Sequence, residues 1–147
     1  MNDFVSRSWA LGVCYTARML FSRIDRFGLP TLRLGLVVLF LWFGLSQVTN
    51  PSAWVAWVPE WMNAFGVSAV AIVLLNGTFE VIFGIALAAG FYTRVSALLL
   101  SLHLFLIAYE IGYNDIGVRD FALAVATLSL AMFGPDQFTI DKRMNRG

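Results

Sequence analysis

The chain has 147 residues, of which 59% are hydrophobic and 13% are charged, and its formal net charge is +1. Soluble domains carry roughly a quarter of charged residues, so this composition predicts a one-domain integral membrane protein in contact with lipid. The near-neutral charge argues against a nucleic-acid partner. Cys14 and His103 are the only cysteine and histidine, which excludes an intrachain disulfide, an iron–sulfur site and bis-histidine haem ligation by this chain alone, and no metal site is predicted.

Residues 1–29 mix basic and aromatic side chains, with four arginines among tryptophan, tyrosine and phenylalanine. This pattern predicts an amphipathic helix that lies in the membrane interface, and a partly disordered basic tail is the alternative. The segment lacks the apolar core and cleavage site of a signal peptide, so we expect it to be retained. Gly28-Leu29-Pro30 follows, and because proline is tolerated in the first turn of a helix, a new helix is predicted to start there.

The first predicted span covers residues 31–48. Arg33, Phe40, Gly44 and Gln47 are spaced by seven, four and three residues, which places them on one polar stripe of a helix. Arg33 lies near the end of the span, so it is either a positive anchor that reaches the head groups or a cation inside the bundle.

Three tryptophans follow the first span, and Pro59 interrupts them: Trp54, Trp57 and Trp61. Tryptophan prefers the membrane interface, where the ring is buried and its N–H remains hydrated. We therefore expect a short amphipathic segment at the outer surface. It is either a simple interfacial anchor or a lid over a cavity between the helices.

The second predicted span, residues 67–89, carries Glu80 in the middle of an otherwise apolar run. A carboxyl group near the bilayer centre costs several kcal/mol unless it faces the protein and finds a partner. Small and polar residues share its helical face and permit close approach of a neighbouring helix: Asn76, Gly77, Gly84 and Ala88. Glu80 is therefore predicted to face the bundle interior.

The third and fourth predicted spans cover residues 95–109 and 117–134. At about 1.5 Å per residue, Glu80 lies roughly 13 Å and His103 roughly 12 Å from the same membrane surface. We therefore predict that the two side chains meet, directly or through one water. They form either a proton relay or a purely structural polar pair between two helices.

A second polar set is predicted near the outer surface, and its members are Gln47, Glu110, Arg119 and Asp120. Their opposite charges can neutralise one another inside the bundle, and a solvated loop cluster is the alternative. With Arg33 and Asn76, residues Gln47, Arg119 and Asp120 are the candidates for lining a substrate pocket.

The Lys and Arg residues predict the orientation of the chain. They gather before the first span, in the second connection and after the fourth span: Arg7, Arg18, Arg23, Arg26, Arg94, Lys142, Arg143 and Arg146. The first connection has none, and the third has only Arg119. By the positive-inside rule both termini are cytoplasmic, and residues 135–147 form a cytoplasmic tail. The predicted fold is an all-α transmembrane four-helix bundle over residues 30–134, in the cytoplasmic membrane.

Several short motifs, in this order, resemble the DoxX/DoxD-like family of small four-helix membrane proteins. They are Leu32-Arg33-Leu34-Gly35, the stretch from Phe40 to Ser46, Phe79-Glu80 with Gly84 and Leu87, the stretch from Gly90 to Arg94, and the stretch from Arg119 to Leu123. The resemblance covers about residues 22–134. One departure concerns Gln47, which stands where the family pattern commonly has a lysine, so a role of that lysine in binding an anion or a quinone does not transfer.

The resemblance implies membrane redox work. DoxD-type members are subunits of thiosulfate:quinone oxidoreductases, and other members associate with oxidoreductase partners. The sequence itself shows no self-contained redox centre, so electrons would come from a partner subunit or from a bound small molecule. We expect a membrane subunit of an oxidoreductase complex that shapes a quinone-accessible pocket, with Glu80 and His103 carrying protons. The alternatives are a non-catalytic accessory or assembly subunit at the rim of a larger membrane complex, and a transporter for a small acid.

Overall fold

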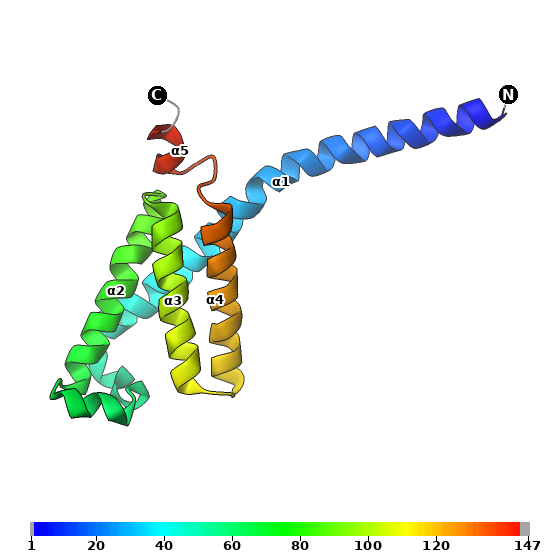
Figure 1. Cartoon of the computed structure of the whole chain (residues 1–147). Helices are drawn as coiled ribbons and strands as arrows, with labels where there is room; N and C mark the ends of the chain where they lie inside the picture. The colour runs from blue at the N-terminus through cyan, green and yellow to red at the C-terminus, as the bar shows by residue number, and fades with distance from the viewer. Residues whose placement is uncertain (1, 145–147) are drawn as a thin grey trace.

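The computed structural model describes the backbone of residues 2–144 and the side chains of residues 26–144, except those at 63 and 65. The described residues form helices and no strand (Figure 1). In chain order the elements are α1 (Asn2–Thr49), the 3-10 helices η1 (Pro51–Trp57) and η2 (Glu60–Phe65), α2 (Ala69–Ala89), α3 (Thr93–Ile111), α4 (Asp115–Phe133) and α5 (Ile140–Met144). The predicted all-α class is confirmed.

Four helical segments are long and apolar enough to cross a membrane: Arg26–Thr49 of α1, and the whole of α2, α3 and α4. The prediction of a multi-pass membrane protein with four spans is therefore confirmed, and the outward-facing apolar side chains of these helices contact lipid. The prediction of an amphipathic, interfacial N-terminal helix depends on the side chains of residues 1–25, which lie outside the described residues.

The prediction that a new helix starts at Gly28-Leu29-Pro30 is wrong, because α1 runs through Pro30. Proline has no N–H to donate to the carbonyl four residues earlier, which is that of Arg26. The side-chain amide of Gln137 donates to this carbonyl at 3.4 Å, so a residue after α4 replaces the missing donor. Figure 1 shows that α1 changes direction where it joins the bundle, as expected for a helix with an internal proline.

The helices pack mainly in two pairs, α1 with α2 and α3 with α4. The first pair is close at Gly44 and Gly77: a Cβ added at Gly77 would lie 2.8 Å from the carbonyl oxygen of Gly44 and 2.7 Å from the Cβ of Gln47. The predicted close approach at small residues is thus confirmed. Fully buried Phe40, Leu87, Leu100 and Leu130 fill the core between the two pairs.

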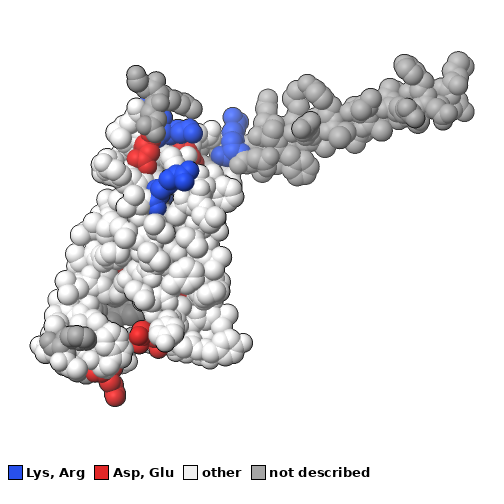
Figure 2. Space-filling model, viewed as in Figure 1, with Lys and Arg blue, Asp and Glu red and all other residues white. Residues whose placement is uncertain are grey.

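One end of the bundle carries most of the described basic side chains, and we call it the basic end. Arg94 is in the first turn of α3, Lys142 and Arg143 belong to α5, which bonds to that turn through Asp141, and the carbonyl of Arg26 accepts from Gln137 in the segment between α4 and α5. Figure 2 shows Lys and Arg side chains gathered at this end of the molecule. Gly90 forms the α2–α3 turn with a φ of +68°, and a Cβ there would clash with Thr139. The chain after α4 therefore covers the turn closely, which only glycine permits at this position.

Arg33 and Asp136 form a buried ion pair at the basic end. Arg33 Nε donates to Asp136 Oδ2 at 2.7 Å, and Arg33 Nη1 donates to the carbonyls of Leu87 at 3.0 Å and Ala88 at 2.8 Å. The guanidinium thus caps the last turn of α2, where carbonyls lack helical partners. The side chain of Arg33 is only 5% exposed, so the interpretation of Arg33 as an anchor that reaches the head groups is wrong.

Asp141 of α5 caps the start of α3 at the same end. Its two carboxylate oxygens accept from the backbone N–H groups of Tyr92 at 2.9 Å and Thr93 at 2.7 Å. Burial opposes ionisation of Asp141, but the N–H donors of Thr93 and Tyr92 outweigh it and hold its pKa below the ordinary value. The first turn of α3 therefore depends on an ionised carboxylate supplied by α5.

The opposite end is formed by η1, η2 and the α3–α4 connection, and we call it the tryptophan end after Trp54, Trp57 and Trp61. The segment that carries these three tryptophans consists of the short 3-10 helices η1 and η2, which are separated by Val58 and Pro59. Trp54 Nε1 donates to Ser46 Oγ at 3.2 Å, which fixes η1 against α1.

Candidate functional site

A cavity of about 570 Å³ opens at the tryptophan end. All four spans and both 3-10 helices contribute to its lining, including Phe43 of α1, Trp57 of η1, Val73 of α2, Leu104 of α3 and Leu123 of α4. Ligand cavities in proteins have volumes of about 300–1,000 Å³ and are mostly apolar with a few convergent polar groups. The cavity fits this description in both size and composition.

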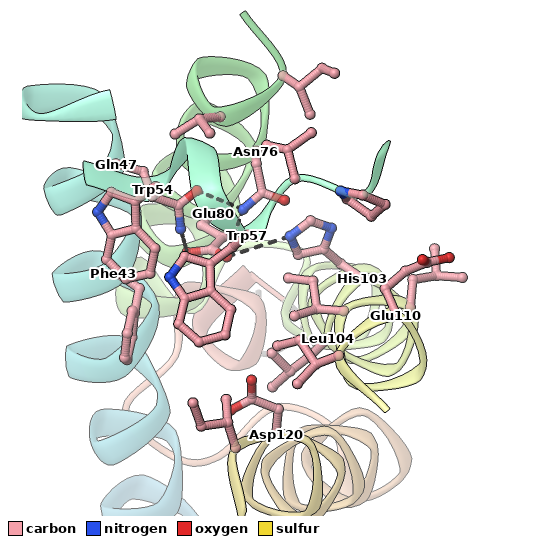
Figure 3. A pocket seen from close by; sticks show the side chains of 18 of the residues that line it. Phe43, Gln47, Trp54, Trp57, Asn76, Glu80, His103, Leu104, Glu110 and Asp120 are labelled. Carbon is pink, nitrogen blue, oxygen red and sulfur yellow. Dashed lines mark hydrogen bonds and ion pairs between the residues drawn. The ribbon is translucent and has the colours of Figure 1, made fainter. Parts of the chain in front are cut away.

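Four polar side chains meet at the inner part of this cavity, and we call them the Glu80 group: Gln47, Asn76, Glu80 and His103. Asn76 Nδ2 donates to Gln47 Oε1 at 2.7 Å and to Glu80 Oε1 at 3.2 Å. Gln47 Nε2 donates to Glu80 Oε2 at 3.4 Å. Figure 3 shows Gln47, Asn76 and His103 converging on the Glu80 carboxylate from α1, α2 and α3. One buried carboxylate thus joins three helices.

The close crossing of α1 and α2 explains how this group forms. A Cβ added at Gly44 would lie 2.9 Å from the carbonyl of Gly77 and 3.0 Å from the Cβ of Glu80. Only the absence of side chains at both glycines lets the helices come this close. The amide of Gln47, one turn after Gly44, is thereby brought to Asn76 and Glu80.

His103 completes the group from α3. Its Nε2 lies 3.4 Å from Glu80 Oε1, so the structure places the two side chains in contact, as their equal predicted depths require. Nε2 is buried but makes no hydrogen bond with the described residues, which means that the 3.4 Å contact lacks hydrogen-bonding geometry. The ring also packs against Phe79 with centroids 4.8 Å apart. A buried nitrogen in this state can still take one more polar partner.

The second predicted set lines the cavity but does not form one cluster: Gln47 belongs to the Glu80 group, Glu110 accepts from Trp61, and only Arg119 and Asp120 pair with each other, on α4. Arg119 Nε donates to Asp120 Oδ1 at 2.8 Å, with side-chain exposures of 52% and 8%. The guanidinium also lies 5.8 Å from the centre of the Phe43 ring. Figure 3 shows Asp120 apart from the Glu80 group. The cavity therefore has two separate polar sites with apolar surface between them.

The tryptophan segment forms part of the wall of the cavity, which favours the interpretation as a lid over a simple interfacial anchor. Trp54, Trp57 and Trp61 all line it. Trp54 packs edge-on against Phe43 with ring centroids 5.7 Å apart. Trp61 Nε1 donates to Glu110 Oε2 at 3.1 Å, so η2 is connected to α3.

Arg33 is the predicted pocket residue that the structure places elsewhere. It lies fourteen residues before Gln47 on α1, which is about 21 Å along a helix, and it pairs with Asp136 at the basic end. Sequence reasoning missed Asp136 because its partner is 103 residues away and because it follows the last span, where a carboxylate normally indicates a solvated tail. Neither residue has neighbours in the sequence that indicate its burial.

The chemistry that this cavity offers follows from its parts. Among the described residues no group of three or more His, Cys, Asp or Glu side chains is arranged to hold a metal ion. The aromatic walls suit a flat, apolar ring, and the Glu80 group offers both hydrogen-bond donors and groups that can exchange a proton.

Comparison with known proteins gives a family. The model of the DoxX family matches residues 28–111, which is more than half of the chain. The chain belongs to the DoxX family. The matched part of this DoxX protein contains the whole Glu80 group, whereas Arg119 and Asp120 lie beyond its end. No curated protein and no solved structure matches the chain.

Proposed function

We propose that this DoxX protein is the membrane subunit of a quinone-linked oxidoreductase and that its cavity holds the quinone headgroup. The observation that carries the proposal is the buried Nε2 of His103, which has no hydrogen-bond partner among the described residues and lies 3.4 Å from the Glu80 carboxylate, inside a largely apolar cavity of about 570 Å³. A quinone oxygen is a hydrogen-bond acceptor that the amide and imidazole groups in the lining of the cavity can satisfy.

The lining fits a quinone in two further respects. Phe43, Trp54 and Trp57 supply aromatic faces for a flat ring. Arg119, beside Asp120, supplies a second polar contact on the α4 side of the cavity. A quinone has two carbonyl oxygens on opposite sides of its ring, so two separated polar sites suit it better than one.

Reduction of a quinone to a quinol takes up two electrons and two protons. We propose that a partner subunit with a redox cofactor supplies the electrons. Glu80 and His103 act as the proton relay, because a carboxyl group and an imidazole can each accept and give up a proton and both line the cavity. Gln47 and Asn76 hold the Glu80 carboxylate through their amide groups.

We further propose that the protein lies in the cytoplasmic membrane with both termini in the cytoplasm. The support is the clustering of Arg26, Arg94, Lys142 and Arg143 at the basic end, which the positive-inside rule assigns to the cytoplasmic surface. The cavity then opens toward the opposite surface of the membrane.

The test combines quinone binding with quinone-coupled turnover. The DoxX protein is purified with its partners in lipid nanodiscs, and a chain-free benzoquinone is titrated while quenching of tryptophan fluorescence reports occupancy next to Trp54 and Trp57. Glu80→Gln should lower quinone-coupled turnover by at least about 100-fold, the usual contribution of a positioned acid or base. The protein should remain folded.

Glu60→Gln is the matched control, because Glu60 is an exposed carboxylate of η2 that does not line the cavity. This variant should turn over like the wild type. Unchanged turnover of Glu80→Gln, together with stable association with a cofactor-bearing complex, would instead assign an accessory role to the protein.

A further inference from the structure

A second hollow, of about 430 Å³, lies beside the main cavity, and we call it the side groove. Its lining is Met62, Val67, Ile72, Leu75, Asn76, Phe79 and His103. Met62, Ile72, Asn76 and His103 line the main cavity as well. The two hollows therefore meet at these four residues, next to the Glu80 carboxylate.

The side groove lies on the bilayer side of α2. Leu75, which lines it, is 69% exposed, and it belongs to a helix that is long and apolar enough to span the membrane. The inner boundary is formed by His103 and by Phe79, whose rings are 4.8 Å apart. The groove therefore leads from the lipid-facing surface of α2 toward the Glu80 group.

The chemistry of the side groove differs from that of the main cavity. Its wall is apolar at Met62, Val67, Ile72, Leu75 and Phe79. Its two polar residues, Asn76 and His103, are shared with the main cavity, so they lie where the hollows meet. A polar ligand has few partners along this wall, whereas a hydrocarbon chain would be buried against it.

We infer that the side groove binds the apolar chain of the ligand whose polar head occupies the main cavity. The inference rests on the proposed function for the identity of that head, and it narrows the substrate class to lipid-soluble quinones that carry a long hydrocarbon chain. Continuity of the two hollows at Asn76 and His103 is the observation that supports one occupant for both. Such a ligand enters from the bilayer, head first, between α2 and α3.

The experiment fills the groove without touching the Glu80 group. Leu75→Trp replaces the leucine side chain with a larger indole ring that occupies the groove. Because Leu75 is exposed to lipid, the bundle should fold normally. Ile82→Trp is the matched control: it lies seven residues further on the same lipid-facing side of α2, is 57% exposed and does not line the groove. Binding of a chain-free benzoquinone and of the same ring with a ten-carbon chain is measured in nanodiscs.

We expect the ten-carbon quinone to lose about tenfold in affinity in Leu75→Trp, since displacing about two buried methylene groups already accounts for that factor. The chain-free quinone should keep its affinity within about twofold. Ile82→Trp should bind both quinones like the wild type. Partition of each quinone into the bilayer is common to all three proteins, so it cancels in the comparison with the wild type.

Equal losses for both quinones in Leu75→Trp, or no loss for either, would overturn the inference while leaving the proposed function intact. Absence of chain-free quinone binding in the wild type would overturn the proposed function itself. In that case a photoreactive ten-carbon alcohol tests whether the side groove binds a hydrocarbon chain. Cross-links concentrated on residues 62–79 would support chain binding there, and uniform labelling of the lipid-facing helices would contradict it.

Discussion

Charged side chains are buried at both ends of the bundle, but their surroundings differ. At the basic end, Arg33 donates to Asp136 and to two carbonyls of α2, and the other carboxylate oxygen of Asp136 accepts from the N–H of Phe138 at 2.8 Å. At the tryptophan end, His103 Nε2 makes no hydrogen bond with the described residues, and Arg119, the partner of Asp120, is half exposed. The ion pair at the basic end has internal partners on both carboxylate oxygens and on two guanidinium nitrogens, whereas the polar groups of the tryptophan end line a cavity.

This difference separates two uses of buried polarity in a membrane protein. An ion pair whose donors and acceptors are bonded within the protein does not offer them to a ligand, so its role is to hold the helices in one arrangement. A buried nitrogen without a hydrogen bond destabilises the folded protein, and a ligand that forms this hydrogen bond removes the cost. The comparison therefore predicts that mutations at the basic end lower stability, whereas mutations at the tryptophan end mainly lower binding and turnover.

The largest effect is expected from breaking the ion pair at the basic end. Asp136→Ala leaves the Arg33 guanidinium buried without its counter-ion, so the free energy of unfolding should fall by about 3–5 kcal/mol. Unfolding of the purified protein by denaturing detergent measures this change. The double variant Arg33→Met/Asp136→Leu should recover most of the loss, because it removes both charges. An unchanged free energy of unfolding in Asp136→Ala would show that the ion pair does not stabilise the helix arrangement.

A smaller loss is expected where α1 and α2 cross. Gly77→Ala adds a Cβ that meets the backbone of Gly44 and the side chain of Gln47, so the free energy of unfolding should fall by about 1–3 kcal/mol. Quinone binding should weaken as well, because the helices that carry Gln47 and Glu80 separate. Gly35→Ala is the control, since its Cβ meets nothing within 4 Å. Equal effects of the two substitutions would contradict a specific role of the crossing.

Glu80→Gln sharpens the comparison from the other side. The amide keeps the shape of the carboxyl group, but its nitrogen cannot accept the hydrogen bond that Gln47 or Asn76 donates to the carboxylate. The free energy of unfolding should therefore fall by about 1–2 kcal/mol, less than in Asp136→Ala. The same detergent titration measures it, next to the large loss of turnover that the proposed function requires. A destabilisation as large as that of Asp136→Ala would mean that the tryptophan end is locked in the same way as the basic end.

The smallest effect concerns the cap of α3. The pKa of Asp141 is lowered in the folded protein, so its stabilisation is complete above the ordinary pKa and is lost as the pH falls below about 4. Asp141→Asn should abolish this part of the acid dependence and leave stability near neutral pH only slightly lower. Circular dichroism measures this loss of stability in a titration from about pH 6 to about pH 3, which spans the ordinary pKa of an aspartate. An unchanged acid profile would show that the cap does not titrate in this range.

Much of the bundle could be predicted because the bilayer constrains local sequence so strongly. Uncharged runs gave the four spans, and a rise of about 1.5 Å per residue was enough to place Glu80 and His103 at one level. The small residues on the Glu80 face of the second span, Gly77 among them, predicted close approach of a neighbouring helix for the same reason, although they did not say which helix. These features depend on the periodicity of a single helix, which the sequence carries directly.

The remaining features depend on residues that are distant in the chain. Pro30 indicates a helix start when only its neighbours are considered, but Gln137 supplies the donor that lets α1 continue. Arg33 resembles a membrane anchor until Asp136 is placed beside it. The wall formed by η1 and η2 also depends on Glu110 and Ser46, which position Trp61 and Trp54. Such pairings follow from tertiary packing and are not encoded in local spacing.

The Arg33–Asp136 pair also bears on biosynthesis. Its members are 103 residues apart, so the ribosome delivers the cation to the translocon long before the matching anion exists. The first helix therefore enters the membrane before its counter-ion has been synthesised, and the Arg33 charge is neutralised only when the segment after α4 folds back onto the bundle.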